Sequence, residues 1–150
     1  MPDVLFYHLE TQPLERVIPV LLEKTLERGW RAVVEVGSSE RAEMLDRALW
    51  TSRDESFLPH GLAGGGSDAD QPVLLTTGTE NGNGAEVRFF TDRAVPKSAE
   101  GYERIVYMFS CHDPDAIVEA REAWKALRAV PGNSLTYWQQ DDTGRWVKRG

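Results

Sequence analysis

Three consecutive residues carry side chains that could support nucleophilic catalysis. Cys111, His112 and Asp113 offer a thiol nucleophile, an imidazole base and a carboxylate that could orient the base. Catalytic triads, however, are assembled in space by the fold, and consecutive side chains at the end of a strand point to opposite faces. The sequence therefore favours a buried, apolar role for Cys111 and a helix-capping role for Asp113. A small α/β enzyme that uses these three residues stays open as an alternative.

A cationic helix face is the second candidate site. Arg121, Trp124, Lys125 and Arg128 are spaced i, i+3, i+4 and i+7, which places them on one side of a predicted helix. Guanidinium groups hold carboxylates in a fork-like geometry, and an indole provides an apolar wall. This face therefore suits a peptide with acidic residues and an apolar terminal side chain. On spacing alone, an ordinary solvated face with a core tryptophan is the stronger interpretation.

Apolar and aromatic residues also gather just before a glycine-rich loop. Trp50, Phe57, Pro59 and His60 fall in a stretch where neither helical nor strand periodicity is maintained. Such residues can fill a core, or they can form an exposed patch, which is usually an interface. The sequence leaves these two interpretations equally open.

Nucleotide and metal chemistry lack their usual sequence signals. Residues 9–13 read Leu-Glu-Thr-Gln-Pro, with no glycine or lysine to form a phosphate loop, and residues 64–66 are glycines without a following Lys-Ser/Thr. One cysteine excludes an internal disulfide, and three scattered histidines do not supply a structural zinc cluster. We therefore expect no cofactor and no metal.

The overall charge argues against direct binding of nucleic acid. A net charge of −7 on 150 residues repels a phosphate backbone, so any link to nucleic acid is expected to be indirect. A direct single-strand binder working through Trp146, Lys148 and Arg149 remains an alternative. No apolar stretch approaches the roughly 20 residues that cross a bilayer, and no signal peptide is evident, so we expect a cytoplasmic protein without a membrane partner.

The predicted elements begin as strand, helix, strand, helix, and three further strands precede the last helix. Strands are expected at residues 3–8, 31–36, 73–77, 86–91 and 104–110, and helices at about 14–26, 39–49 and 114–130. A glycine-rich loop lies at about 61–71, a polar turn at 78–84 and a C-terminal hairpin at about 134–149. This order predicts a single α/β domain over 1–150, with a mostly parallel or mixed sheet and helices on both faces.

Residues 46–50, Asp-Arg-Ala-Leu-Trp, and residues 56–64, Ser-Phe-Leu-Pro-His-Gly-Leu-Ala-Gly, are similar to the signature of the DNA polymerase III chi subunit family. The Gly-Trp-Arg at 29–31 and the helix at 121–128 add to the resemblance. It implies a nucleotide-binding-like fold without a phosphate loop and without catalytic activity. Family members are adaptors that link the clamp loader to single-stranded-DNA-binding protein during DNA replication.

The resemblance also assigns partners to surfaces. It gives Arg121, Trp124, Lys125 and Arg128 to the acidic, phenylalanine-terminated tail of single-stranded-DNA-binding protein. Trp50, Phe57 and Pro59 are given to the psi subunit of the clamp loader, with His60 as a weaker candidate. The sequence departs from the expected pattern at Trp124, where a smaller, tyrosine-like aromatic would be expected.

Overall fold

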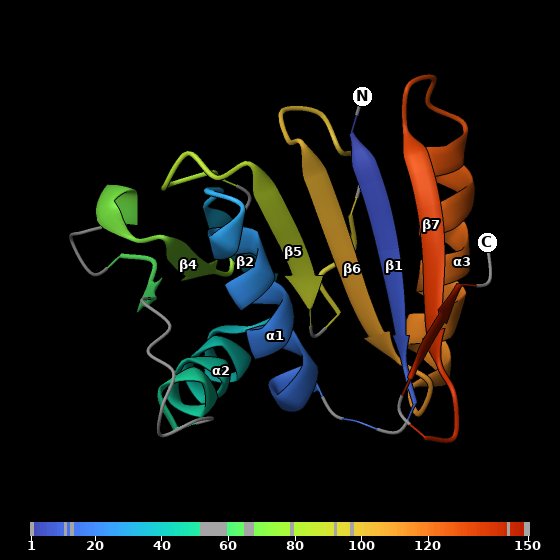
Figure 1. The fold of residues 1–150 in the computed structure, drawn as a ribbon, viewed down its shortest axis with the longest axis horizontal. Helices are drawn as coiled ribbons and strands as arrows, with labels where there is room; N and C mark the ends of the chain where they lie inside the picture. Colours follow the sequence, from blue (N-terminus) through green and yellow to red (C-terminus); the bar gives the residue numbers. More distant parts are fainter. Residues whose placement is uncertain are drawn as a thin grey trace.

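Strands and helices alternate up to residue 51, as the sequence predicts, and several strands then precede the last helix (Figure 1). The computed structural model describes residues 2–10, 12, 14–51, 60–64, 68–78, 80–91, 93–96, 98–143 and 145–148. The helices are α1 (Leu14–Glu27), α2 (Ser39–Thr51), α3 (Pro114–Arg128) and a short 3₁₀ helix, η1 (Asp68–Asp70). The strands are β1 (Asp3–Leu9), β2 (Ala32–Val36), β3 (Gly61–Leu62), β4 (Val73–Thr76), β5 (Val87–Thr91), β6 (Arg104–Ser110), β7 (Ser134–Gln140) and β8 (Trp146–Lys148).

Local sequence signals account for the start of α3. The carboxylate of Asp113 accepts hydrogen bonds from the backbone N–H groups of Asp115 and Ala116, at 3.1 and 3.2 Å. Pro114 follows in the first turn of α3, where a backbone N–H would have no acceptor within the helix, so the missing N–H of proline costs no hydrogen bond. These are the roles that the sequence predicts for Asp113 and Pro114, and they fix the helix that carries the cationic face.

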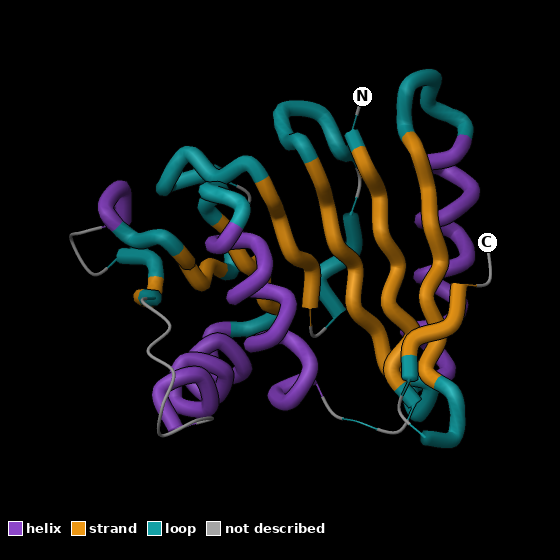
Figure 2. The backbone as a smooth tube through the Cα atoms, in the orientation of Figure 1, coloured by secondary structure: helices purple, strands orange, loops and turns teal. Residues whose placement is uncertain are grey.

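The strands form one eight-stranded sheet in the order β3-β4-β2-β5-β6-β1-β7-β8. Every neighbouring pair is parallel except β7 and β8, which pair antiparallel as the predicted C-terminal hairpin. Figure 2 shows the strands side by side, with the helices outside them. The mixed α/β sheet predicted from the sequence is confirmed.

Helices cover both faces of this sheet, but they cover different halves of it. α1 and α2 pack on one face against the core around Val34, Phe89 and Met108, whereas α3 packs on the other against Phe6 and Tyr107 (Figure 1). Among the described residues, no helix lies directly on the α1-side face over β1 and β7. In the described part of the chain, no helix is both long and apolar enough to cross a membrane.

Loops cover the α3-side face of the sheet beside β2 and β4, and buried polar side chains bond these loops to the strands. Residues 77–86 connect β4 to β5, which lie on either side of β2, so this segment is a crossover and not a turn between neighbouring strands. Asn83 is buried and donates to the carbonyl oxygens of Ala32 and Gln71, both at 2.9 Å. Arg88, 3% exposed, bonds the Glu35 carboxylate and loop carbonyl groups. These bonds attach the loops to the sheet.

Candidate functional site

The four residues predicted to bind the tail lie on α3 as their spacing requires. Arg121, Lys125 and Arg128 are exposed, whereas Trp124 is half-buried between the helix and the sheet. The Trp124 ring packs edge-on against Phe6, with centroids 5.2 Å apart, and against Tyr137 of β7, with centroids 5.8 Å apart. Trp124 is thus both a core side chain and part of the surface beside the cationic residues.

A surface hollow of about 460 Å³ opens between α3, β1, β6 and β7. We call it the α3–β7 pocket, and it is lined by His8, Phe109, Ile117, Ala120, Arg121, Trp124, Lys125 and Tyr137. Three of the predicted residues thus meet in one pocket, while Arg128 lies one helical turn beyond its lining. The aromatic and aliphatic walls can receive an apolar side chain, and Arg121 and Lys125 can bind carboxylates at the edge.

His8, Phe109 and Tyr137 are pocket residues that sequence reasoning missed. The Tyr137 hydroxyl and Nδ1 of His8 lie 2.9 Å apart. Burial raises the pKa of Tyr137 to about 12 and lowers the pKa of His8 from its ordinary value, although nearby Glu10 opposes the shift at His8. At neutral pH the pocket therefore presents an uncharged phenol and a largely uncharged imidazole, and its positive charge comes from Arg121 and Lys125.

Cys111, His112 and Asp113 are held by different partners. Cys111 is half-buried and not fully buried as the sequence predicts. This partial burial raises the pKa of its thiol, which keeps it in its less nucleophilic form. Nε2 of His112 lies 3.2 Å from the carbonyl oxygen of Glu10, and Asp113 caps α3 and pairs with Arg93 at 3.2 Å. In this geometry the carboxylate does not orient the imidazole toward the thiol.

The carboxyl end of β1 is where a nucleotide-binding sheet would hold phosphate. Here the backbone N–H groups of Glu10 and Gln12 donate to Oε1 of Gln140, at 3.0 and 3.2 Å, and Gln140 is 1% exposed. Two backbone donors that could bind phosphate are therefore already satisfied. A hollow of about 500 Å³ remains nearby, and its charged lining includes Glu10, Glu15 and Asp113 as well as Arg41 and Arg93.

The residues predicted to contact psi are only partly described. Phe57 and Pro59 lie outside the described residues, as does the side chain of Trp50, whose backbone is the penultimate residue of α2. His60 is buried, and its Nε2 lies 3.2 Å from the backbone oxygen of Asp46 and 3.1 Å from a carboxylate oxygen of the same residue. His60 therefore attaches the start of β3 to α2.

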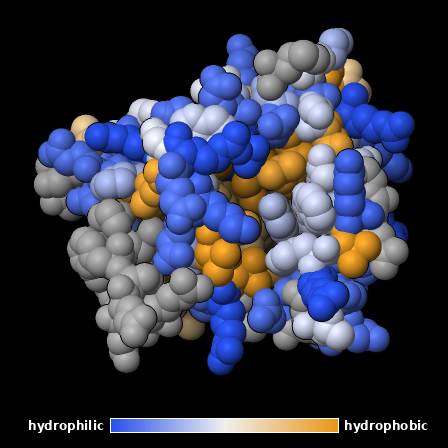
Figure 3. Space-filling model, in the orientation of Figure 1, coloured by the Kyte–Doolittle hydropathy of each residue, from blue (hydrophilic) through white to orange (hydrophobic). Residues whose placement is uncertain are grey.

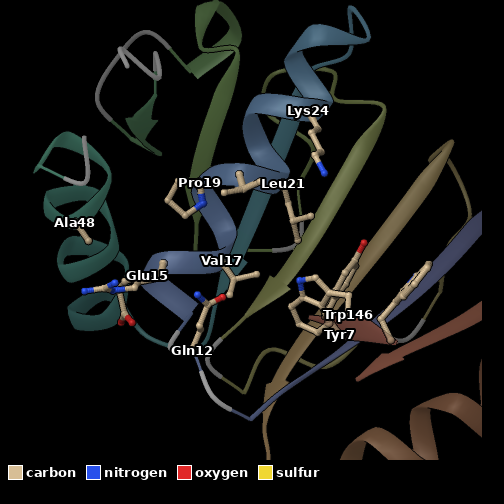
Figure 4. A pocket seen from close by; sticks show the side chains of 12 residues that line it. Tyr7, Gln12, Glu15, Val17, Pro19, Leu21, Lys24, Ala48 and Trp146 are labelled. Atoms are coloured by element: carbon tan, nitrogen blue, oxygen red, sulfur yellow. The ribbon is translucent and has the colours of Figure 1, made fainter. Parts of the chain in front are cut away.

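A larger hollow, of about 930 Å³, lies on the α1-side face. Figure 3 shows an apolar patch in the middle of this face, and Figure 4 shows Tyr7 and Trp146 across the hollow from Val17 and Leu21 of α1. The rings of Tyr7 and Trp146 pack edge-on with centroids 4.9 Å apart. Trp146, one of the residues weighed for single-strand binding, thus lines the hollow. Lys148 is exposed on β8, and Arg149 lies outside the described residues.

The described fold and these sites define a small α/β domain of nucleotide-binding type, and its sequence has no phosphate-loop motif. Residues 1–133 match the model of the family described as "DNA polymerase III chi subunit, HolC". The chain belongs to this family, and so to the subunits of the DNA polymerase III replicase that act in DNA replication.

Curated relatives agree with this assignment. A protein of Rickettsia prowazekii described as "Probable DNA polymerase III subunit chi" is 30% identical over 157 residues, which cover 99% of this chain and 92% of the relative. The DNA polymerase III subunit chi of Pseudomonas aeruginosa is 27% identical, over 72% of this chain and 74% of its own length. That of Escherichia coli is 35% identical, over 50% of this chain and 56% of its own length.

Proposed function

We propose that this chain is a non-catalytic adaptor of the replicase that binds the acidic C-terminal tail of single-stranded-DNA-binding protein and links it to the clamp loader in the cytoplasm. The observation that carries the proposal is the α3–β7 pocket, in which Arg121 and Lys125 stand beside an aromatic wall. Family membership supports a role in replication, and the pocket supplies chemistry that fits this tail.

The pocket matches the two parts of such a tail. A phenylalanine side chain can pack against the wall that the rings of Trp124 and Tyr137 form, where edge-to-face contacts between aromatic rings are favourable. Arg121 can hold the terminal carboxylate, and Lys125 can attract the preceding acidic residues. Because Arg121 and Lys125 are exposed, these charge interactions should weaken as salt rises.

Titration with a fluorescent peptide that ends in Asp-Asp-Ile-Pro-Phe tests the proposal. An exposed ion pair contributes about 0.2–1 kcal/mol. Lys125→Glu replaces attraction with repulsion of similar size, so affinity should fall about 2- to 30-fold. Lys148→Glu makes the same charge change at an exposed lysine on β8. Lys148 pairs across the strands with Trp138, which lines the hollow on the α1-side face, so this variant should leave affinity unchanged. Absence of binding by the folded wild type, or equal losses in both variants, would overturn the proposal.

A second surface is proposed for the psi subunit, at the end of α2 and in the segment that follows. Trp50, Phe57 and Pro59 are the apolar residues proposed to contact psi, and the buried His60, which follows them in the sequence, contacts Asp46 of α2. Phe57→Ala should reduce co-purification with psi, because an interface loses an apolar contact. It should leave binding of the tail peptide unchanged. Undiminished co-purification of Phe57→Ala with psi would show that psi does not bind at this surface.

A further inference from the structure

His8, Glu10 and Cys111 converge at the carboxyl ends of β1 and β6. β1 and β6 pair in parallel with His8 beside Phe109, so Glu10 and Cys111 each follow directly after the paired stretch. A ring nitrogen of His8, a carboxylate oxygen of Glu10 and Sγ of Cys111 all lie within 4.8 Å of one another. Within the described ranges, this is the group of such side chains that is close enough to share a metal ion.

Hydrogen bonds orient the side chains of His8 and Glu10, and each bond uses only one of the two atoms that could bind a metal. Nδ1 of His8 is engaged by the Tyr137 hydroxyl at 2.9 Å, and Oε1 of Glu10 accepts from Nε2 of Gln139 at 2.6 Å. Ligands in metal sites are commonly oriented in this way, through the second ring nitrogen or the second carboxylate oxygen. Nε2 of His8 and Oε2 of Glu10 are then the atoms left for a metal.

Nε2 of His8 is also a buried atom without a hydrogen-bond partner among the described residues. Leaving a buried polar atom unpaired destabilises a protein by about 1–3 kcal/mol, so an unpaired nitrogen beside a thiol and a carboxylate calls for a physical reason. Coordination of a cation would satisfy it.

We propose that His8, Glu10 and Cys111 bind a divalent transition-metal ion, with Zn²⁺ as the preferred ion. Imidazole and thiolate ligands favour zinc over magnesium or calcium, which prefer oxygen ligands alone. Tetrahedral coordination needs ligand atoms about 3.5 Å apart, so the three side chains close around the ion by small rotations. Three protein ligands leave a fourth position for water or for another ligand.

Cobalt titration of the protein, purified without a histidine tag, tests the site. Co²⁺ bound by a thiolate gives a sulfur-to-metal charge-transfer band in the near ultraviolet, and Zn²⁺ should displace the cobalt and abolish the band. Cys111→Ser should remove the band, and His8→Gln should weaken Co²⁺ binding at least tenfold. Tyr137→Phe, which removes only the hydroxyl beside His8, should weaken binding about tenfold.

His112→Gln is the matched control. His112 follows Cys111 directly, but it is exposed and its Nε2 contacts the Glu10 carbonyl group, so the cobalt band should persist in this variant. Circular dichroism verifies that each variant is folded. A folded wild type without the band, undiminished Co²⁺ affinity of His8→Gln, or a loss confined to His112→Gln would overturn the proposal. None of these readouts involves the tail peptide.

Discussion

Two adjacent residues of β7 provide a sharp test of the α3–β7 pocket. Tyr137 lines this pocket, whereas Trp138 lines the large hollow beside α1. Neighbouring side chains of a strand point to opposite faces, so truncating each one probes a different side of the same sheet. Tyr137→Ala and Trp138→Ala are therefore matched variants that remove an aromatic ring from successive positions.

The expected loss of affinity follows from the geometry of Tyr137. Its ring packs with Trp124 and Phe109 at centroid distances of 5.8 and 6.0 Å, and it forms one wall of the space for an apolar anchor. An aromatic pair contributes about 0.5–1.5 kcal/mol beyond the area that it buries. Adding a modest burial term gives about 1–2 kcal/mol, so Tyr137→Ala should weaken the tail peptide roughly 5- to 30-fold.

Fluorescence anisotropy with the tail peptide measures this loss, and thermal unfolding measures the stability of each variant. Both residues are half-buried, so both truncations should lower the free energy of unfolding by about 1–3 kcal/mol. Only Tyr137→Ala should lose affinity. Equal affinities of the two variants, whether both are lost or both are retained, would refute the placement of the tail in this pocket.

Further predictions concern the polar interior and the thiol. Arg88→Met should destabilise the protein by about 3–5 kcal/mol in chemical denaturation, because it leaves the Glu35 carboxylate without its buried partner; an effect below about 1 kcal/mol would contradict the buried pair. Gln140→Ala should lower stability by about 2–3 kcal/mol, because two backbone N–H groups lose their acceptor; unchanged unfolding would show that water replaces the side chain. Native Cys111 should react with iodoacetamide more slowly than the unfolded chain, since burial raises its pKa; rapid reaction would favour the enzyme alternative.

The helix with its cationic face could be predicted because its signals are local. Asp113 and Pro114 mark the start, and the spacing of Arg121, Lys125 and Arg128 places three charges on one side without any knowledge of the fold. The same holds for the hairpin at the C-terminus, where a short polar turn separates two apolar runs. These elements need only neighbours in the sequence to be recognised.

The pocket itself could not be predicted, because it depends on the order of the strands. Alternation shows that Tyr137 and Trp138 face opposite sides, but it does not show which side α3 covers. His8 joins Tyr137 only because β7 lies beside β1, 129 residues away in sequence. Gln140 and Arg88 are similar cases: each is a polar residue in a strand, and only the fold shows that it is buried.

The family match covers only part of the α3–β7 pocket. The family model matches residues 1–133 and therefore includes α3, with Arg121 and Lys125, but it ends just before β7 begins at Ser134. The cationic side of the pocket thus lies inside the match, whereas the Tyr137 wall lies outside it. The family match therefore covers the cationic residues of the proposed tail site, whereas the wall proposed to contact the terminal side chain lies in a strand beyond that match. The difference in tail affinity between Tyr137→Ala and the wild type should therefore be much smaller for a tail whose final aromatic residue is replaced by alanine than for the intact tail. The reason is that Tyr137 is proposed to contact this final aromatic side chain.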